Sequence, residues 1–182
     1  MTETVSSWVR RFAPLIPSGE VLDLACGDGR HARHLAGLGH DVIALDRDGA
    51  ALEQAAGQGI VTAQFDLEAA GAAWPFAVGR FAGIVVSNYL HRPLFGEIGA
   101  SLAADGVLIY ETFAAGNADF GKPSSPHFLL APGELLDWAR QLNLRVVAFE
   151  DGRVDHPKAA MVQRLCAVRG DFPRQAALLA PF

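Results

Sequence analysis

The chain has 182 residues, of which 51% are hydrophobic and 19% charged, and this balance predicts one domain with a core of its own. No apolar run approaches the roughly 20 residues that a membrane-spanning helix needs, so we expect no membrane segment despite a mean hydropathy of +0.20. The formal net charge is −5, and no run of Lys or Arg exceeds the pair Arg10-Arg11. Nucleic acid is not expected as a partner, because proteins that bind its phosphate backbone need a basic stripe.

Two features favour a cytoplasmic location. Residues 1–11 lack the basic segment, the apolar segment and the small-residue cleavage site of a secretory signal. Cys26 and Cys166 are the only cysteines, which suits a reducing compartment better than a disulfide framework. We therefore expect a cytoplasmic, single-domain protein that covers residues 1–182.

The first segment predicts an amphipathic helix over about residues 3–13, because Val5, Trp8, Val9 and Phe12 recur at helical spacing. From residue 20 to about 168, short β-rich runs alternate with helical ones and predict the core; the tail is 171–182. Predicted strands cover residues 21–25, 41–45, 60–65, 81–87, 107–111, 144–150 and 161–168, and predicted helices cover 30–38, 48–56, 93–102 and 133–142. The structure of the alanine- and glycine-rich segment 68–80 stays open.

The last predicted strand should run antiparallel to the others. The connection 151–158 before it is too short for the crossover of a dozen or more residues that parallel neighbours need. The pattern predicts a Rossmann-like α/β fold with a seven-stranded sheet, in which six strands are parallel, the last is antiparallel and helices cover both faces. The long loop 112–132 is expected to be a lid that helps form a substrate pocket.

A glycine-rich turn follows the first predicted strand and opens a helix. Its sequence, Gly27-Asp28-Gly29-Arg30-His31-Ala32, matches the loose dinucleotide-binding pattern G-x-G-x-x-G/A. Glycines there let a ligand approach main-chain amides, which suits several nucleotide-derived cofactors. The motif alone therefore predicts a cofactor site without choosing the cofactor.

Nearby carboxylates favour one cofactor over the others. Asp23, Asp28, Asp46 and Asp66 lie near the carboxyl ends of the first three strands, so we expect them to surround one crevice. Two like charges 4 Å apart repel by roughly 4 kcal/mol at an effective dielectric of 20, which makes this crevice poor for a pyrophosphate. S-adenosyl-L-methionine has no phosphate, carries a sulfonium and an ammonium, and has a ribose that needs an acceptor such as Asp46.

Three segments resemble the motifs of a known family, the class I S-adenosylmethionine-dependent methyltransferases. The run Val21 to Gly29 is similar to motif I of that family, Ile43-Ala44-Leu45-Asp46 to its acidic second motif, and Phe65-Asp66-Leu67 to its adenine-contacting segment. The resemblance spans roughly residues 20–168, and the antiparallel seventh strand belongs to it. Arg30 and Ser87-Asn88-Tyr89-Leu90 resemble small-molecule members such as the tellurite-resistance methyltransferases.

The resemblance implies a cofactor site and a reaction. The implied cofactor-binding residues are Asp23, Ala25, Cys26, Gly27, Asp28, Gly29, Arg30, Asp46, Arg47, Phe65, Asp66, Leu67, Ser87 and Asn88. The implied reaction is an in-line displacement in which an acceptor takes the sulfonium methyl group and leaves S-adenosyl-L-homocysteine. Positioning supplies much of such a rate enhancement, so a base is needed only where the nucleophile loses a proton.

The sequence departs from the family pattern in two places. Phe81-Ala82-Gly83 lacks the acid that many relatives carry before the fourth strand, and no Asn-Pro-Pro-Tyr segment follows that strand. The second departure disfavours acceptors that are nucleic-acid bases or glutamine side chains. We therefore expect a small neutral or anionic molecule as the acceptor and partner.

Four residues are candidates to orient or deprotonate the acceptor: Tyr89, His91, Glu111 and, more weakly, His127 in the loop. For His91 and Glu111 a purely structural role is an equal alternative. His31 and His34 share a helix face that we expect to be solvated, since no third ligand lies at metal-binding spacing. No metal site is expected, and Cys26 need not be reactive.

Two other functions remain open. An NAD-dependent oxidoreductase would also use the glycine motif, but Asp23 and the antiparallel last strand disfavour it. A non-catalytic S-adenosylmethionine-binding module would keep the loop and show no methyl transfer. The sequence indicates neither the acceptor nor an oligomeric state.

Overall fold

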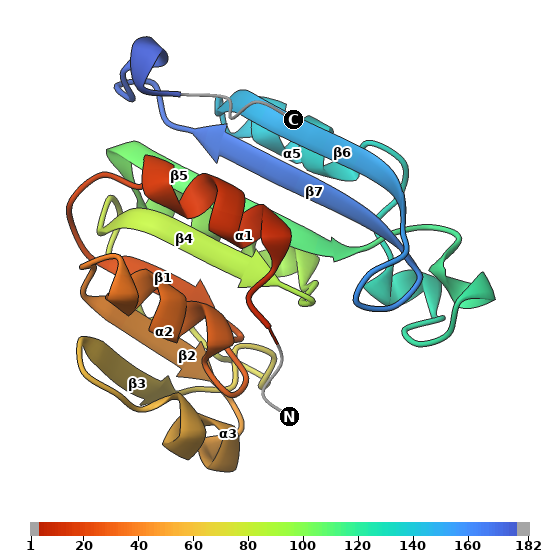
Figure 1. Cartoon of the computed structure of the whole chain (residues 1–182), viewed down its shortest axis with the longest axis horizontal. Helices are drawn as coiled ribbons and strands as arrows, with labels where there is room; N and C mark the ends of the chain where they lie inside the picture. Colours follow the sequence, from red (N-terminus) through yellow and green to blue (C-terminus); the bar gives the residue numbers. More distant parts are fainter. Residues whose placement is uncertain (1–3, 178–182) are drawn as a thin grey trace.

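The computed structural model describes residues 4–177, which form one seven-stranded sheet with helices on both faces (Figure 1). The strands are β1 (Val21–Leu24), β2 (Val42–Asp46), β3 (Ile60–Gln64), β4 (Phe81–Ser87), β5 (Leu102–Phe113), β6 (Arg145–Val154) and β7 (Ala160–Val168). The helices are α1 (Ser7–Phe12), α2 (Arg30–Gly37), α3 (Gly49–Ala55), α4 (Phe95–Ser101) and α5 (Glu134–Gln141), with short 3-10 turns between them.

The strand order confirms the predicted fold. The sheet runs β3-β2-β1-β4-β5-β7-β6, and only β7 is antiparallel to its neighbours β5 and β6. The chain reverses direction after β6, and β7 inserts between β5 and β6. All six other strands thus point the same way, so their carboxyl ends share one edge of the sheet.

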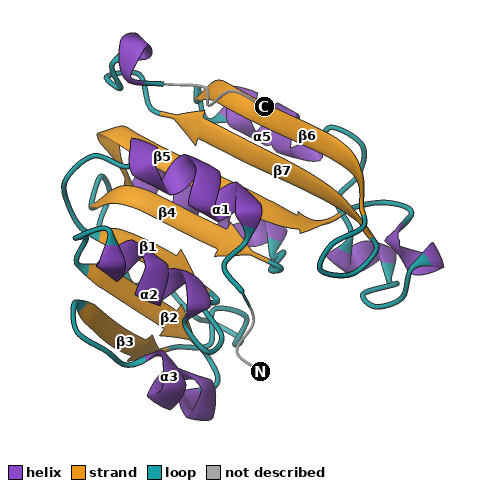
Figure 2. Ribbon diagram, in the orientation of Figure 1, coloured by secondary structure: helices purple, strands orange, loops and turns teal. Residues whose placement is uncertain are grey.

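Strand alternation builds two separate cores, one on each face. Leu22, Leu24 and Tyr110 pack on the face that α4 and α5 cover, whereas Val21 and Val85 pack under α1, α2 and α3. Figure 2 shows α1 and α2 in front of the sheet and α5 behind it. Burial of this much aliphatic surface on both faces supplies the main driving force for folding.

Helix ends follow the local side chains. The Ser6 hydroxyl accepts hydrogen bonds from the backbone N–H groups of Trp8 and Val9, and α1 starts at Ser7. The expected start at about residue 3 lies outside the described residues. The Asp48 carboxylate caps α3 in the same way, through the N–H groups of Ala50 and Ala51. These hydrogen bonds satisfy backbone N–H groups that the first turn of each helix would otherwise leave unpaired.

Residues 68–80, whose structure the sequence left open, form neither helix nor strand, and the same holds for residues 65–67 before them. Aromatic side chains of this segment cover the sheet instead. Trp74 donates its indole N–H to the Ser101 hydroxyl over 2.8 Å, and the ring of Phe76 meets Phe81 edge to face at 5.0 Å. The segment therefore closes one face of the sheet between β3 and β4.

The hairpin of β6 and β7 is longer than the hydrophobic pattern predicts. Its strands continue through residues 151–154 and leave only residues 155–159 as the turn. Backbone pairing between the strands holds this exposed extension, which has no buried face that a sequence pattern could reveal. Within residues 4–177, no helix is long and apolar enough to cross a membrane.

Candidate functional site

The glycine loop begins where β1 ends and is tied to the end of β2. Ala25 and Gly27 both have a φ of 55°, and Gly29 has a φ of 78° where α2 starts. The backbone N–H of Gly27 donates to Oδ2 of Asp46 over 2.8 Å, and the N–H of Asp48 donates to Oδ1 over 3.0 Å. One carboxylate thus fixes the course of two loops at the carboxyl edge of the sheet.

The two glycines of the loop face different surroundings. A Cβ built on Gly27 would meet no atom within 4 Å, so the loop presents open space at this position. A Cβ built on Gly29 would lie 2.5 Å from Cβ and 2.7 Å from Cα of Ala55, so α3 packs directly on the loop. Gly29 is needed for close packing, whereas Gly27 leaves room for a ligand.

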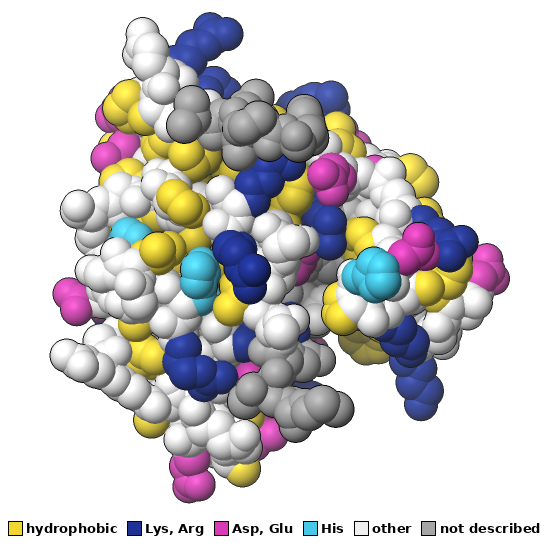
Figure 3. Space-filling model, viewed as in Figure 1, with side chains coloured by type: hydrophobic (Ala, Val, Ile, Leu, Met, Phe, Trp, Pro, Cys, Tyr) yellow, Lys and Arg dark blue, Asp and Glu magenta, His cyan; other side chains and the backbone are white. Residues whose placement is uncertain are grey.

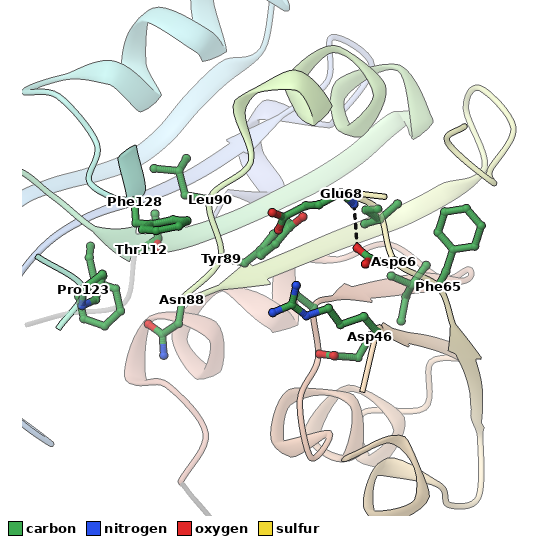
Figure 4. A pocket seen from close by; sticks show the side chains of 15 residues that line it. Asp46, Phe65, Asp66, Glu68, Asn88, Tyr89, Leu90, Thr112, Pro123 and Phe128 are labelled. Carbon is green, nitrogen blue, oxygen red and sulfur yellow. Dashed lines mark hydrogen bonds between the residues drawn. The ribbon is translucent and has the colours of Figure 1, made fainter. Parts of the chain in front are cut away.

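A cavity of about 450 Å³, which we call the Asp46 cavity, opens beside this loop (Figure 4). It is lined by Ala25, Leu45, Asp46, Arg47, Phe65, Asp66, Leu67, Glu68, Asn88, Tyr89, Leu90, Thr112, Phe113, Pro123 and Phe128. Figure 4 shows Asp46, Phe65 and Asp66 on one side, Pro123 and Phe128 on the other, and Tyr89 and Asn88 between them. Most of the lining comes from the carboxyl ends of β1, β2, β4 and β5 and from the segments that follow them.

A second cavity of about 440 Å³, the hairpin cavity, lies between α1, β5 and the β6–β7 turn. It is lined by Thr4, Val5, Ser6, Ser7, Arg30, Asn88, Glu111, Thr112, Phe113, Asn117, Phe120, Lys122, Val154, His156, Pro157, Lys158, Ala159, Ala160, Val162 and Arg164. Asn88, Thr112 and Phe113 line both cavities. The two cavities therefore meet at the ends of β4 and β5.

The expected ring of four carboxylates is only half correct. Asp46 and Asp66 line the Asp46 cavity, but Asp28 lines neither cavity and lies 3.9 Å from Arg33. Asp23 lies one residue before the end of β1 on the α2 face, where its side chain is 1% exposed. Alternation of side chains along the strand turns it beneath the loop instead of into the crevice.

Asp23 is a buried carboxyl group with an incomplete set of partners. Its Oδ2 has no hydrogen-bond partner among residues 4–177. Burial raises the pKa of Asp23 to about 7, against the lowering effects of the Ala32 backbone N–H and of Arg30. The neighbouring Cys26 thiol stays protonated, because burial and then Asp23 raise its pKa.

The catalytic candidates occupy different places. Tyr89 lines the Asp46 cavity, and burial followed by Glu68 raises the pKa of its hydroxyl, which stays protonated. Glu111 lines the hairpin cavity. His91 and His127 line neither cavity, although the backbone around His127 forms part of the loop above them. Their positions thus give no support to a role at the acceptor.

Glu111 is the centre of a polar network on the floor of the hairpin cavity. Glu111 is 8% exposed. Its Oε1 accepts a hydrogen bond from the Ser87 hydroxyl over 3.2 Å, and its Oε2 lies 3.2 Å from Nε of Arg164. Arg164 also pairs with Glu150 over 3.3 Å, and Arg30 donates to Ser87 over 3.4 Å. These contacts hold the Glu111 carboxylate in one orientation beside the junction of the cavities.

The predicted lid 112–132 forms walls of both cavities and is fastened at its base. Asn117 donates to the carbonyl of Pro123 over 2.9 Å and accepts the N–H of Met161 over 3.1 Å. Arg92 donates to the carbonyls of residues 127 and 129 and forms an ion pair with Glu134 over 2.6 Å. Tertiary contacts therefore shape this loop into a wall.

His31 does not lie on a solvated face, contrary to the expectation. It is 2% exposed, and its Nε2 accepts the backbone N–H of Ser6 over 3.3 Å, which joins α2 to the start of α1. Burial lowers the pKa of His31 to about 3, so the ring is neutral. Among the described residues, no group of three or more His, Cys, Asp or Glu is arranged to hold a metal ion.

Several lining residues carry no sequence signal that singled them out. Glu68 lies in the segment left open, and Lys122 lies in the expected lid. Lys158 and Arg164 come from the hairpin, far along the chain from the glycine loop. The sequence feature that could have drawn attention to Lys122 and Lys158 is the scarcity of lysine, since they are the only two lysines in the sequence.

Comparison with known proteins gives a family match and many structures with the same fold. Residues 21–106 match the family model described as a methyltransferase domain. No curated protein matches the chain. TehB from Haemophilus influenzae is similar with a TM-score of 0.74 and 19% identity over 91% of this chain; the chain spans 63% of TehB.

Two further solved structures align over most of the chain. An S-adenosylmethionine dependent methyltransferase from Mesorhizobium loti has a TM-score of 0.70 and 17% identity, covering 88% of this chain and 95% of its own. Geranyl diphosphate C-methyltransferase from Streptomyces coelicolor, in complex with Mg²⁺, geranyl diphosphate and S-adenosyl-L-homocysteine, has a TM-score of 0.67 and 15% identity. That alignment covers 90% of this chain and 79% of the enzyme, and at these identities the likeness shows the fold.

Proposed function

We propose that this chain is a class I S-adenosylmethionine-dependent methyltransferase and that it methylates a small-molecule acceptor bound in the hairpin cavity. The observation that carries the proposal is the junction of the two cavities at Asn88, Thr112 and Phe113. A cofactor in the Asp46 cavity and an acceptor in the hairpin cavity would meet there. Holding two reactants in this way removes much of the entropic barrier of a bimolecular reaction.

The Asp46 cavity suits the nucleoside half of S-adenosyl-L-methionine. Each carboxylate oxygen of Asp46 accepts one backbone N–H, and a carboxylate oxygen has a further lone pair for a ribose hydroxyl. Arg47 lies beside it, and Phe65, Asp66 and Leu67 form the wall that we assign to the adenine ring. Cavity shape and acceptor chemistry therefore fit the group that the family uses.

The methionine half is assigned to the glycine loop and its surroundings. Gly27 offers open space beside main-chain amides, and Ala25 and Asn88 line the cavity next to it. The proposed contacts there come from Ala25, Cys26, Gly27, Asp28, Gly29, Arg30, Ser87 and Asn88, with Asp23 beneath them. The buried and partly unsatisfied carboxyl of Asp23 would support the loop from below and favour a cation above it.

When bound, S-adenosyl-L-methionine supplies an electrophilic methyl group. The chain's own contribution is to exclude water and to orient the acceptor: Phe113 separates the two cavities, and Asn88 and Thr112 offer polar atoms at their junction. Glu111 is the residue placed to take a proton from an acceptor, since Ser87 and Arg164 hold its carboxylate at the floor of the hairpin cavity. Tyr89 keeps its proton and can donate a hydrogen bond.

A small-molecule acceptor also agrees with the size of the hairpin cavity. Its volume of about 440 Å³ is that of a site for a small molecule, not of a groove for a folded partner. Geranyl diphosphate, the ligand in the structure of the Streptomyces coelicolor enzyme, shows that this fold accommodates molecules of that class. The methyl acceptor of this chain is proposed to belong to the same size class.

A thermal-shift comparison tests the cofactor assignment. S-adenosyl-L-homocysteine at 100 times its dissociation constant adds roughly 2.7 kcal/mol, which for a domain of this size raises Tm by about 5 to 10 °C. NAD should give no comparable shift, because the Asp46 cavity has no strong phosphate clamp. A larger shift with NAD than with S-adenosyl-L-homocysteine would contradict the proposal.

The alternative of a non-catalytic binding module requires a second measurement. The protein is incubated with methyl-labelled S-adenosyl-L-methionine and the low-molecular-weight fraction of a cell extract, with Asp46→Ala as the control. Labelled product that depends on the wild-type protein supports catalysis. Binding of S-adenosyl-L-homocysteine without any transfer would favour the module.

A further inference from the structure

The only two lysines of the chain line the same cavity. Of 15 Lys and Arg residues, Lys122 and Lys158 alone are lysine; one lies in the loop after β5 and the other in the β6–β7 turn. Arg30 and Arg164 line the same cavity, and Glu111 is the only carboxylate that residues 4–177 contribute to its lining. A protein with a net charge of −5 therefore has one cavity with an excess of positive charge.

Lys158 packs against the segment that carries Lys122. A Cβ built on Gly121 would lie 3.2 Å from Nζ of Lys158, so this ammonium group rests on the backbone beside Lys122. Neither lysine has a hydrogen bond or an ion pair within residues 4–177. An anion bound at this point would gain from the positive charges of both lysines.

Three acids on the strands and the turn around the cavity have arginine partners. Glu111 and Glu150 pair with Arg164, and Asp155 accepts from Arg153 over 2.6 Å. The ammonium groups of Lys122 and Lys158 thus remain available to a ligand at the mouth of the cavity. Figure 3 shows a hollow between the body of the sheet and the lobe that contains the β6–β7 turn, with Lys and Arg side chains on both sides.

The rest of the cavity is largely apolar. Phe113, Phe120, Val154 and Val162 contribute side chains to its walls. Neither lysine lines the Asp46 cavity, so the positive end lies away from the junction where the methyl group would arrive. A ligand that fills the cavity would therefore need an apolar body, an anionic group at one end and its reacting atom at the other.

We propose that the acceptor is an amphipathic anion, a carboxylate or a phosphate ester, whose anionic group binds between Lys122 and Lys158 while its apolar body lies against Phe113 and Phe120. This inference rests on the proposed function, because it takes the hairpin cavity as the acceptor site. Ammonium groups suit either anion as point charges, without the fixed geometry that a guanidinium imposes.

Titration calorimetry with three probes of similar size tests the proposal. Phenyl phosphate, phenylacetate and the neutral phenylacetamide are titrated into the protein with and without S-adenosyl-L-homocysteine. At least one anion should bind about tenfold more tightly than the amide, and the tighter of the two identifies a phosphate ester or a carboxylate as the natural group. Equal binding of all three probes would overturn the proposal.

Variants then locate the binding site. Lys122→Ala and Lys158→Ala should each lower the affinity for the anion by about tenfold. Lys122→Arg and Lys158→Arg should retain most of that affinity, because they keep the positive charge. Arg140→Ala is the matched control, because it removes one exposed positive charge on α5 that lines neither cavity. Losses no greater than that of Arg140→Ala would place the anion elsewhere and overturn the proposal.

Cofactor affinity distinguishes failure of this inference from failure of the proposed function. If S-adenosyl-L-homocysteine binds the wild type and the lysine variants equally but no anion is preferred, the methyltransferase assignment stands and the anionic acceptor does not. If S-adenosyl-L-homocysteine fails to bind while the anion binds through both lysines, the proposed function fails and the anion site remains.

Discussion

Oδ2 of Asp46 accepts the backbone N–H of Gly27 over 2.8 Å, so the carboxylate at the end of β2 holds the loop that follows β1. The same side chain faces the Asp46 cavity, where we assign it to the ribose. Its two roles make it the residue on which cofactor binding should depend most strongly.

Asp46→Ala should lower the affinity for S-adenosyl-L-homocysteine by about tenfold to a hundredfold, because the ribose loses a charged acceptor and the glycine loop loses its support. Calorimetric titration measures the loss. Asp48→Ala is the control: it removes the cap of α3 two residues further along but no part of the cavity lining. Unchanged affinity in Asp46→Ala would mean that another group holds the ribose.

Gly29→Ala should mainly lower stability, whereas Gly27→Ala should mainly lower cofactor affinity. At Gly29 the added methyl group meets the backbone of Ala55 and a φ of 78°, which should lower the free energy of unfolding by about 2 to 4 kcal/mol. At Gly27 the methyl group enters open space, so the stability cost should stay near 1 kcal/mol while cofactor affinity falls. Denaturant unfolding and calorimetry on both variants measure the two effects. The prediction fails if Gly27→Ala is the less stable variant.

Asp23 should make the stability fall as the pH rises. Its pKa is about 7 in the folded protein and near 3.8 in the unfolded chain, so between these values only the folded protein holds the proton. The free energy of unfolding contributed by Asp23 is greatest below about pH 4 and decreases by about 1.4 kcal/mol per pH unit towards pH 7. The difference between wild type and Asp23→Asn, followed by urea unfolding from pH 4 to 7, isolates this slope. A difference that does not change with pH would show that burial leaves the carboxyl unperturbed.

His31 should make the stability rise with pH over part of the same range, opposite to the effect of Asp23. Its pKa of about 3 in the folded protein lies below the ordinary value of 6.5, so stability is lost as the pH falls below about 6.5. The wild type should therefore depend weakly on pH between 4 and 6.5, where the two contributions offset each other. Only the difference between variants reveals the contribution of Asp23.

Glu111→Gln should lower turnover by about 10² to 10⁴ if the acceptor loses a proton, while the affinity for S-adenosyl-L-homocysteine stays close to that of the wild type. Glu150→Gln is a matched control, since Glu150 pairs with the same Arg164 but lines neither cavity. Steady-state kinetics with an identified acceptor, measured as a function of pH, provide the comparison. Equal losses in both variants would assign Glu111 to structural support of Arg164.

Local sequence patterns were sufficient to predict the fold, because each pattern that indicates a strand, a helix or a turn lies within a single segment. The buried run Val21 to Leu24 followed by glycines identifies a strand and a ligand loop, and the short connection before β7 requires an antiparallel strand. Sequence patterns did not predict the structure where backbone pairing or aromatic packing determines it and hydrophobic periodicity is absent. Residues 65–80 and the exposed end of the hairpin are such places. They also failed at Asp23, because proximity to a strand end does not tell on which face a side chain lies.

By itself, then, the sequence determined the order of strands and helices, the glycine loop and the acid at the end of β2, since each depends on neighbours a few residues away. Only the tertiary structure decided which groups share a cavity. Lys122 comes from the loop after β5, whereas Lys158 and Arg164 come from the β6–β7 hairpin, and no spacing along the chain relates them to Arg30. The antiparallel return of β7 brings its residues opposite the end of β5, and this long-range pairing creates the cavity in which we place the acceptor.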